Sequence, residues 1–186
     1  GIVKTPSDFG KLSGGATHPG LIDWLAKRFI DSGWSLKAMH RLIVTSATYK
    51  QVSLKDGRDA AWSFRLQTDP GKNLWSRQIR RRLTGEMLRD TMLAVSSSLS
   101  KRKGGPGVRP PLPTEITSTL LRNQWPVSKD EADHRRRSIY LFARRNLRYP
   151  LFELFDRPAL AETCARRKIS TTAPQSLALL NSEFAR

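Results

Sequence analysis

Residues 17–47 read THPGLIDWLAKRFIDSGWSLKAMHRLIVTSA and show a clear helical pattern. Apolar residues recur at helical spacing in both halves of this stretch: Leu21, Ile22, Leu25 and Phe29, then Leu36, Met39, Ile43 and Ala47. Thr17 and Ser35 are suitable caps for the two starts, and Gly33 suits the end of the first helix. The pattern predicts two helices joined by a short turn, as a helical hairpin or corner. A DNA-reading helix-turn-helix is an alternative that the scarcity of basic, Asn and Gln side chains on the second helix disfavours.

Working outward, we predict helical segments near residues 60–66, 83–99, 114–124 and 150–155, and a last helix capped by Thr172. In the helix over 83–99, the spacing predicts that Leu88, Met92 and Val95 face inward. The run SIYLFA at 138–143 is rich in β-forming residues and predicts a buried strand. The predicted fold class is therefore mainly α with a minor β element.

We expect residues 1–186 to form one helical domain that is truncated at both ends, as a piece of a longer protein. Residues 101–113 contain three glycines and four prolines, so this segment is a possible internal hinge. No apolar run approaches the ~18 residues that a membrane span requires, and no targeting signal is visible in the fragment.

The chain carries 33 Lys and Arg against 16 Asp and Glu, a net charge of +17 over 186 residues. Residues 71–150 hold 18 of the basic and only 6 of the acidic side chains. A field of this sign attracts polyanions, and the arginine fork suits carboxylate, sulfate and phosphate groups. The predicted anion-binding residues are Arg80, Arg81, Arg82, Arg135, Arg136, Arg137, Arg144 and Arg145.

Three kinds of partner fit this charge: acidic or sulfated polysaccharide, nucleic acid as the less favoured polymer, and acidic parts of the parent chain that cover the arginines. We expect at least one arginine of the 135–137 run to turn inward and pair with Glu86 or Asp90, because side chains alternate along a strand.

Glu86 and Asp90 lie four residues apart on one predicted helix, a spacing that would let them act as acid and base or hold a metal. Their basic neighbours favour a salt-bridge network instead. Cys164 could serve as a nucleophile, although a lone cysteine is more often a small packed residue. Because Cys164 is the only cysteine, the chain cannot form an internal disulfide. The scattered histidines predict no metal site, and His40 is expected in the core. Among the tryptophans, we expect Trp24 in the core and favour Trp75 and Trp125 for stacking on a ligand.

The chain resembles the planctomycete surface domain family, a domain of unknown function (DUF1553). The stretches that carry the resemblance are GIVKTPSDFG at 1–10, THP at 17–19, GWSLK at 33–37, residues 40–49, RRL at 81–83 with Glu86, Arg89 and Asp90, RRSIY at 136–140, RRN at 144–146, FD at 155–156, and residues 164–181. The family's usual helical opening and its C-terminal helical tail are absent.

The resemblance implies a part of a large multidomain bacterial protein at the cell surface or in the periplasm. It implies neighbouring domains of the same parent chain as partners, including a c-type cytochrome domain. Any haem would belong to that neighbour, since this fragment has no Cys-x-x-Cys-His motif, and we expect no cofactor of its own. The resulting hypothesis is a non-catalytic structural or interaction domain. The alternatives are a polyanion-binding module and a hydrolase-like enzyme that uses Glu86 and Asp90.

Overall fold

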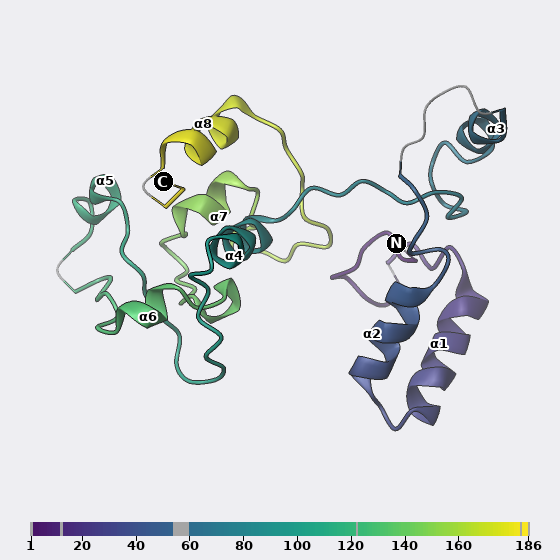
Figure 1. Cartoon of the computed structure of the whole chain (residues 1–186), viewed down its shortest axis with the longest axis horizontal. Coiled ribbons are helices and arrows are strands. Elements are labelled where there is room, and N and C mark those ends of the chain that lie inside the picture. The colour runs from purple at the N-terminus through teal and green to yellow at the C-terminus, as the bar shows by residue number, and fades with distance from the viewer. Residues whose placement is uncertain (1, 12, 54–59, 122, 183, 186) are drawn as a thin grey trace. The chain divides into compact units, whose positions relative to one another are not determined.

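The computed structural model describes residues 2–11, 13–53, 60–121, 123–182 and 184–185. The chain divides into two compact units, Gly1–Arg81 and Arg82–Arg186. The prediction of a mainly helical fold is confirmed (Figure 1). The elements are α1 Pro19–Asp31, α2 Leu36–Thr45, α3 Ala60–Thr68, α4 Gly85–Val95, α5 Thr114–Thr117, α6 Glu131–His134, the 3-10 turn η1 Ser138–Tyr140, α7 Pro150–Leu154 and α8 Ala173–Asn181. Within the described residues, β structure is confined to isolated bridges.

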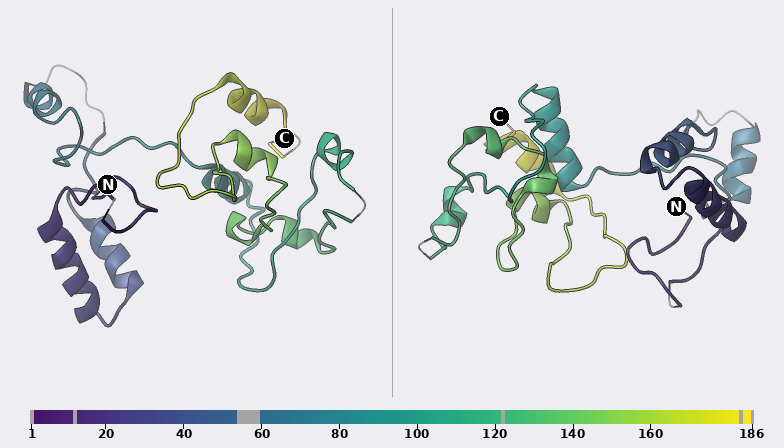
Figure 2. Two further views of the ribbon diagram at one scale, coloured as in Figure 1. Left: turned by 180° about the vertical axis from the view of Figure 1, so that it is seen from behind. Right: turned by 90° about the horizontal axis from the view of Figure 1, so that it is seen from below.

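The first unit is built on the predicted hairpin, in which α1 and α2 lie side by side (Figures 1 and 2). Gly33 ends α1 with a φ of 66°, a left-handed conformation that favours glycine. The Oγ atom of Ser35 then accepts the backbone N–H of Ala38 at 3.2 Å and caps α2 as predicted.

The core of the second unit is small and gathers Val108, Leu141 and Phe152. The Val108 N–H donates to the carbonyl of Tyr140 at 2.8 Å, and its own carbonyl accepts the Phe142 N–H at 2.8 Å. Helix α4 packs on α7 beside this core. The contact is close enough to favour a glycine, because a Cβ atom on Gly85 would lie 3.0 Å from the Cα atom of Phe152.

The prediction of a strand over Ser138–Ala143 is wrong. Ser138–Tyr140 forms a 3-10 turn, and only Leu141 makes a bridge, to Val108. The backbone N–H of Ser138 donates to the Asp90 carboxylate at 2.7 Å. The Asp90 side chain therefore takes the place of a ladder partner, and this contact between distant segments overrides the β propensity of the run.

The predicted inward face of the third helix is wrong at Val95, whereas Leu88 and Met92 are half-buried beside the buried positions. Val95 is 82% exposed, and the fully buried positions of α4 are Gly85, Arg89 and Leu93. These residues are spaced four apart, so they form one stripe that a search for hydrophobic residues alone overlooks. The helix ends at Val95 rather than Leu99, because Ser97 turns into the left-handed region with a φ of 58°.

The glycine- and proline-rich segment 101–113 lies within the second unit, and its Val108 is one of the core residues. Its role as a hinge, and the assignment of residues 1–186 to one domain, stay predictions. Over the described parts of the chain, none of the helices has both the length and the apolar composition that crossing a membrane demands.

Candidate functional site: a basic cluster on the second unit

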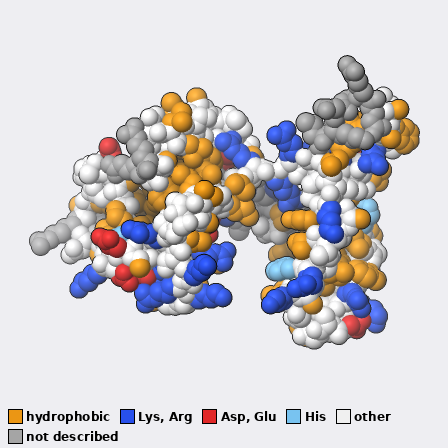
Figure 3. Space-filling view, in the orientation of Figure 1, with side chains coloured by type: hydrophobic (Ala, Val, Ile, Leu, Met, Phe, Trp, Pro, Cys, Tyr) orange, Lys and Arg blue, Asp and Glu red, His pale blue; other side chains and the backbone are white. Residues whose placement is uncertain are grey.

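Backbone pairing brings two basic runs together. Ser100 and Arg136 form a parallel bridge, in which the Ser100 N–H donates to the carbonyl of Arg135 at 3.0 Å. The run at 101–103 therefore lies beside the run at 135–137. We define the basic cluster as Lys101, Arg102, Lys103, Arg135 and Arg137. Figure 3 shows Lys and Arg side chains gathered along the edge of this unit next to α6, with acidic side chains among them.

Arg136, the middle residue of its run, points inward. Its side chain is buried, its Nη2 atom donates to the carbonyl of Gly104, and its Nη1 atom lies 3.7 Å from the Asp133 carboxylate. Its guanidinium also stacks over the Tyr140 ring at 4.0 Å from the centroid. Arg136 thus fastens the loop after Lys103 to the segment that carries Arg135 and Arg137.

The members of the basic cluster differ in how far their charge is neutralised. Arg102 lies 3.4 Å from Asp130 and 3.3 Å from Asp133. Arg137 lies 3.7 Å from the Asp90 carboxylate, yet 65% of its side chain is exposed. Three members of the basic cluster are exposed and make no ion pair with the described residues: Lys101, Lys103 and Arg135. The expected pairing with Asp90 is therefore made by Arg137, while the residue that turns inward is Arg136.

The other predicted arginines fall into two groups. Arg82 and Arg144 are engaged in the fold: Arg82 donates to the carbonyl of Ser170 at 2.5 Å, and Arg144 donates to the carbonyl of Gln124. Arg145, also in the second unit, is exposed. Arg80 and Arg81 belong to the first unit and are likewise exposed. Anion binding by the exposed arginines stays a prediction.

Glu86 and Asp90 are both ion-paired. Arg167 donates to both carboxylate oxygens of Glu86 at 3.0 Å, and Arg157 lies 3.7 Å away. Burial acts to raise the pKa of Glu86, but the hydrogen bonds and charge of Arg167 outweigh it, so this pKa lies below its ordinary value. Asp90 accepts the Ser138 N–H and faces Arg137. This geometry supports the salt-bridge interpretation over an acid and base pair, since a general acid needs a raised pKa.

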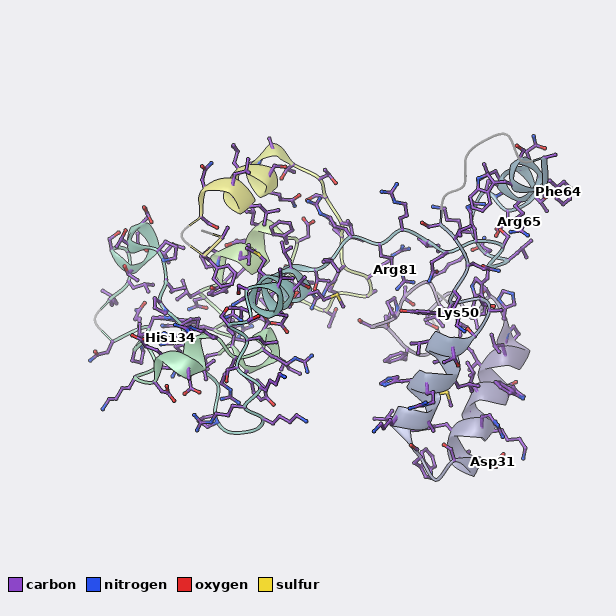
Figure 4. All side chains as sticks on the ribbon, viewed as in Figure 1. Asp31, Lys50, Phe64, Arg65, Arg81 and His134 are labelled. Atoms are coloured by element: carbon purple, nitrogen blue, oxygen red, sulfur yellow. The ribbon has the colours of Figure 1, made fainter. Side chains whose placement is uncertain are left out.

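Cys164 is half-buried and makes no hydrogen bond with the described part of the chain. His134, labelled in Figure 4, ends α6 and places its Nε2 atom 2.7 Å from the carbonyl of Ser128. The core position expected for His40 is wrong, because that residue is exposed. Across the described residues, no three His, Cys, Asp or Glu side chains come together in a way that could hold a metal ion.

The tryptophan expectations are reversed at two positions. Trp24 is 49% exposed, whereas Trp125 is buried and donates from Nε1 to the carbonyl of Pro110 at 2.8 Å. Trp125 therefore belongs to the packed interior of the second unit and has no face available for stacking on a ligand.

Comparison with known families now places the chain. The model of the family described as "PSD1: Protein of unknown function (DUF1553)" matches residues 1–186. The chain belongs to this family. No curated protein and no solved structure shows a significant match. The DUF1553 description names no activity.

Proposed function

We propose that this DUF1553 chain is a non-catalytic interaction domain whose second unit binds polyanions through the basic cluster. The observation that carries the proposal is the bridge between Ser100 and Arg136, which holds two basic runs side by side. Lys101, Lys103 and Arg135 are exposed on these neighbouring segments and carry unpaired charge, and buried Arg136 ties the two segments together. A prearranged set of cations loses little conformational entropy when a polyanion binds.

Acidic or sulfated polysaccharide is the preferred ligand, and nucleic acid is the alternative. The cluster is carried by a loop and by the end of a four-residue helix, so no helix of it is long enough to read a DNA groove. Its contacts would be to charge alone, and both polymers would compete for it.

The test replaces Lys101, Lys103 and Arg135 together by Gln and measures retention on immobilised heparin and on duplex DNA as salt is varied. A matched control replaces three exposed cations of the first unit, Lys37, Arg41 and Lys50, so that both variants lose the same charge. For a duplex, each phosphate contact contributes about 0.9 to the slope of log affinity against log salt. We expect the cluster variant to lower that slope by about 2 to 3 and the control variant to leave it nearly unchanged.

Equal losses in the two triple variants would show that net charge alone governs retention, and the proposal would fail. A cluster variant that weakens binding to heparin more than binding to DNA would identify the polysaccharide as the ligand. Arg137 is left intact because its contact with Asp90 supports the fold.

The proposal also covers the partners of the chain and its place in the cell. We infer that the neighbouring domains of the parent chain, a c-type cytochrome domain among them, are its partners, and that it works at the cell surface or in the periplasm of a bacterium. The resemblance to other DUF1553 chains supports this setting. Copurification of the parent chain's domains after separate expression would test it, and fractions in which this domain elutes alone would contradict it.

A further inference from the structure

The first unit contains an apolar groove of about 620 Å³. Leu21, Trp24 and Leu25 of α1 and Leu42 and Ile43 of α2 form much of its wall, together with Trp75. In α1 and α2, all of whose residues are described, none is fully buried. Figure 3 shows hydrophobic side chains on the visible surface of this hairpin. The two helices thus present spaced apolar side chains that the described part of this unit covers only in part: Leu21, Leu25 and Leu42 are half-buried, and Trp24 and Ile43 are exposed.

A strained loop positions Trp75 in the groove wall. Trp75 adopts a φ of 54°, and its ring lies 4.5 Å from that of His18. The loop is held by Asp69, which is buried and accepts the N–H groups of Asn73 at 2.7 Å and Leu74 at 3.1 Å. A bulky residue with a positive φ persists only where its surroundings impose it, and such positions concentrate at binding sites.

Two of the polar side chains that line the groove are engaged within the fold. Gln78 donates to the carbonyl of Tyr49 at 3.1 Å and accepts the N–H of Ile79 at 3.1 Å. The Ser46 hydroxyl donates to the carbonyl of Ile43 and accepts the N–H of Tyr49. These two side chains already bond within the fold, and apolar and aromatic side chains make up most of the lining. The groove therefore fits an apolar ligand.

The charge around the groove selects the kind of apolar ligand. Arg81 lines the groove, is exposed and makes no ion pair with the described residues. Residues 1–81 carry 14 Lys and Arg against 6 Asp and Glu. A partner with carboxylates beside its apolar side chains would meet complementary charge here.

We propose that this groove binds an amphipathic helix of a partner protein, one with apolar residues on one face and acidic residues beside them. Such a helix would lie along α1 and α2 as a third helix of a small bundle. Side chains at i, i+3, i+4 and i+7 would enter between Trp24, Ile43 and Trp75, and a carboxylate would pair with Arg81.

The probe is a fluorescein-labelled helical peptide with Leu at i, i+3, i+4 and i+7 and Glu at the positions that flank this apolar face. Fluorescence anisotropy measures its binding to the full chain. The test variant is Ile43→Glu, and its matched control is Val44→Glu. Both residues belong to α2 and are similarly exposed, at 40% and 46%, but only Ile43 lines the groove. We expect Ile43→Glu to weaken binding at least ~10-fold and Val44→Glu less than ~2-fold.

A second matched pair tests the charge: Arg81→Gln against Arg80→Gln, of which only Arg81 lines the groove. We expect Arg81→Gln to weaken binding and Arg80→Gln to leave it unchanged. The same peptide with Lys in place of Glu should bind less tightly. If the peptide binds Ile43→Glu and Arg81→Gln as tightly as it binds the parent, it must bind elsewhere, on the basic cluster of the second unit. That result would overturn the proposal. Equal binding of the Lys peptide, or no binding of the Glu peptide, would overturn it as well.

Discussion

Arg89 of α4 donates a hydrogen bond from its Nη1 atom to the carbonyl oxygen of Arg136, at 2.8 Å, where the side chains of both arginines are buried. Its Nη2 atom donates to the carbonyl of His134 at 2.6 Å, and the ring of Phe184 lies 5.4 Å from its guanidinium. One buried cation therefore holds the chain segment that carries Arg135 and Arg137. The exposed charges of the basic cluster depend on this buried support.

Replacing Arg89 should destabilise the second unit. Arg89→Met leaves the carbonyls of His134 and Arg136 without their donor, and we expect a loss of about 3 kcal/mol in the free energy of unfolding. Arg89→Lys should lose about 2 kcal/mol, because an ammonium group cannot reproduce the planar fork. Urea unfolding followed by circular dichroism measures both. The control is Arg145→Met, at an exposed position of the same unit, which should change stability by less than ~0.5 kcal/mol. A stability of Arg89→Met equal to that of this control would contradict the role assigned to Arg89.

Gly85→Ala tests the contact between α4 and α7. Its Cβ atom would lie 3.0 Å from the Cα atom of Phe152 and 3.2 Å from the carbonyl oxygen of Leu151, both backbone atoms that cannot move aside cheaply. We expect a loss of about 1 to 3 kcal/mol. The matched control is Gly20→Ala in the first turn of α1, where an added Cβ meets nothing within 4 Å. Alanine should stabilise that helix by up to ~1 kcal/mol. If the two variants melt alike, the close packing of α4 on α7 is not as described.

Leu93→Asp and Val95→Asp test which face of α4 is buried. Leu93 is 7% exposed and Val95 is 82% exposed. An aspartate at Leu93 would bury an unpaired charge, so we expect it to unfold most of the second unit. An aspartate at Val95 remains in solvent and should cost about 0.5 kcal/mol through its unfavourable place near the helix C-terminus. Hydrogen exchange of the α4 amides reports both effects. Strong loss of protection in Val95→Asp alone would restore the inward face that the hydrophobic spacing predicts.

The sequence predicts several helix starts because their caps are local signals, although the cap expected at Thr17 is wrong: His18 is the N-cap of α1 and makes no side-chain capping hydrogen bond. Ser35 and Thr84 each accept an N–H three residues ahead, and the Thr172 N–H donates to the side chain of Gln175 at 3.2 Å. These contacts lie within one turn of the chain, so the residue types and their spacing are sufficient to place the helix starts. Helix α6 is not predicted from the sequence, because a helix of only four residues is too short to show a helical pattern.

The basic cluster is less accessible to sequence reasoning because it depends on contacts between distant segments. Lys101 and Arg135 are brought together by one bridge at Ser100, and no local pattern encodes it. The burial of Arg89 and Arg136 runs against the general preference of arginine for the surface, and it is permitted by acceptors that only the fold supplies. The sequence does show the basic run at 135–137, and the Gly104-Gly105 pair, with its positive φ values, lets the loop turn back beside Arg136.

Acid should destabilise the second unit, and Asp156 should account for part of the effect. Asp156 accepts the backbone N–H and the hydroxyl of Ser170, both at 2.7 Å. These hydrogen bonds, with a smaller contribution from the charge of Arg82, hold the pKa of Asp156 below its ordinary value against the opposing effect of burial. The charged carboxylate is therefore the form that the fold stabilises. Its contribution is fully present above the unfolded pKa of about 4, and it is lost as pH falls through the lower pKa of the folded state.

Asp156→Asn removes this proton linkage. We expect the variant to be less stable than the parent at pH 7 and to lose less stability than the parent on moving to about pH 3. Glu86, whose pKa is also lowered, retains its own contribution in the variant, so the acid sensitivity should shrink without vanishing. The control is Glu162→Gln, at an exposed residue with no ion pair among the described residues, which should keep the parent's pH profile. The urea concentration at the midpoint of unfolding, measured at a series of pH values, gives the pH profile of stability for the parent and each variant. A pH profile of Asp156→Asn that runs parallel to that of the parent would show that the contact between Asp156 and Ser170 does not stabilise the charged carboxylate.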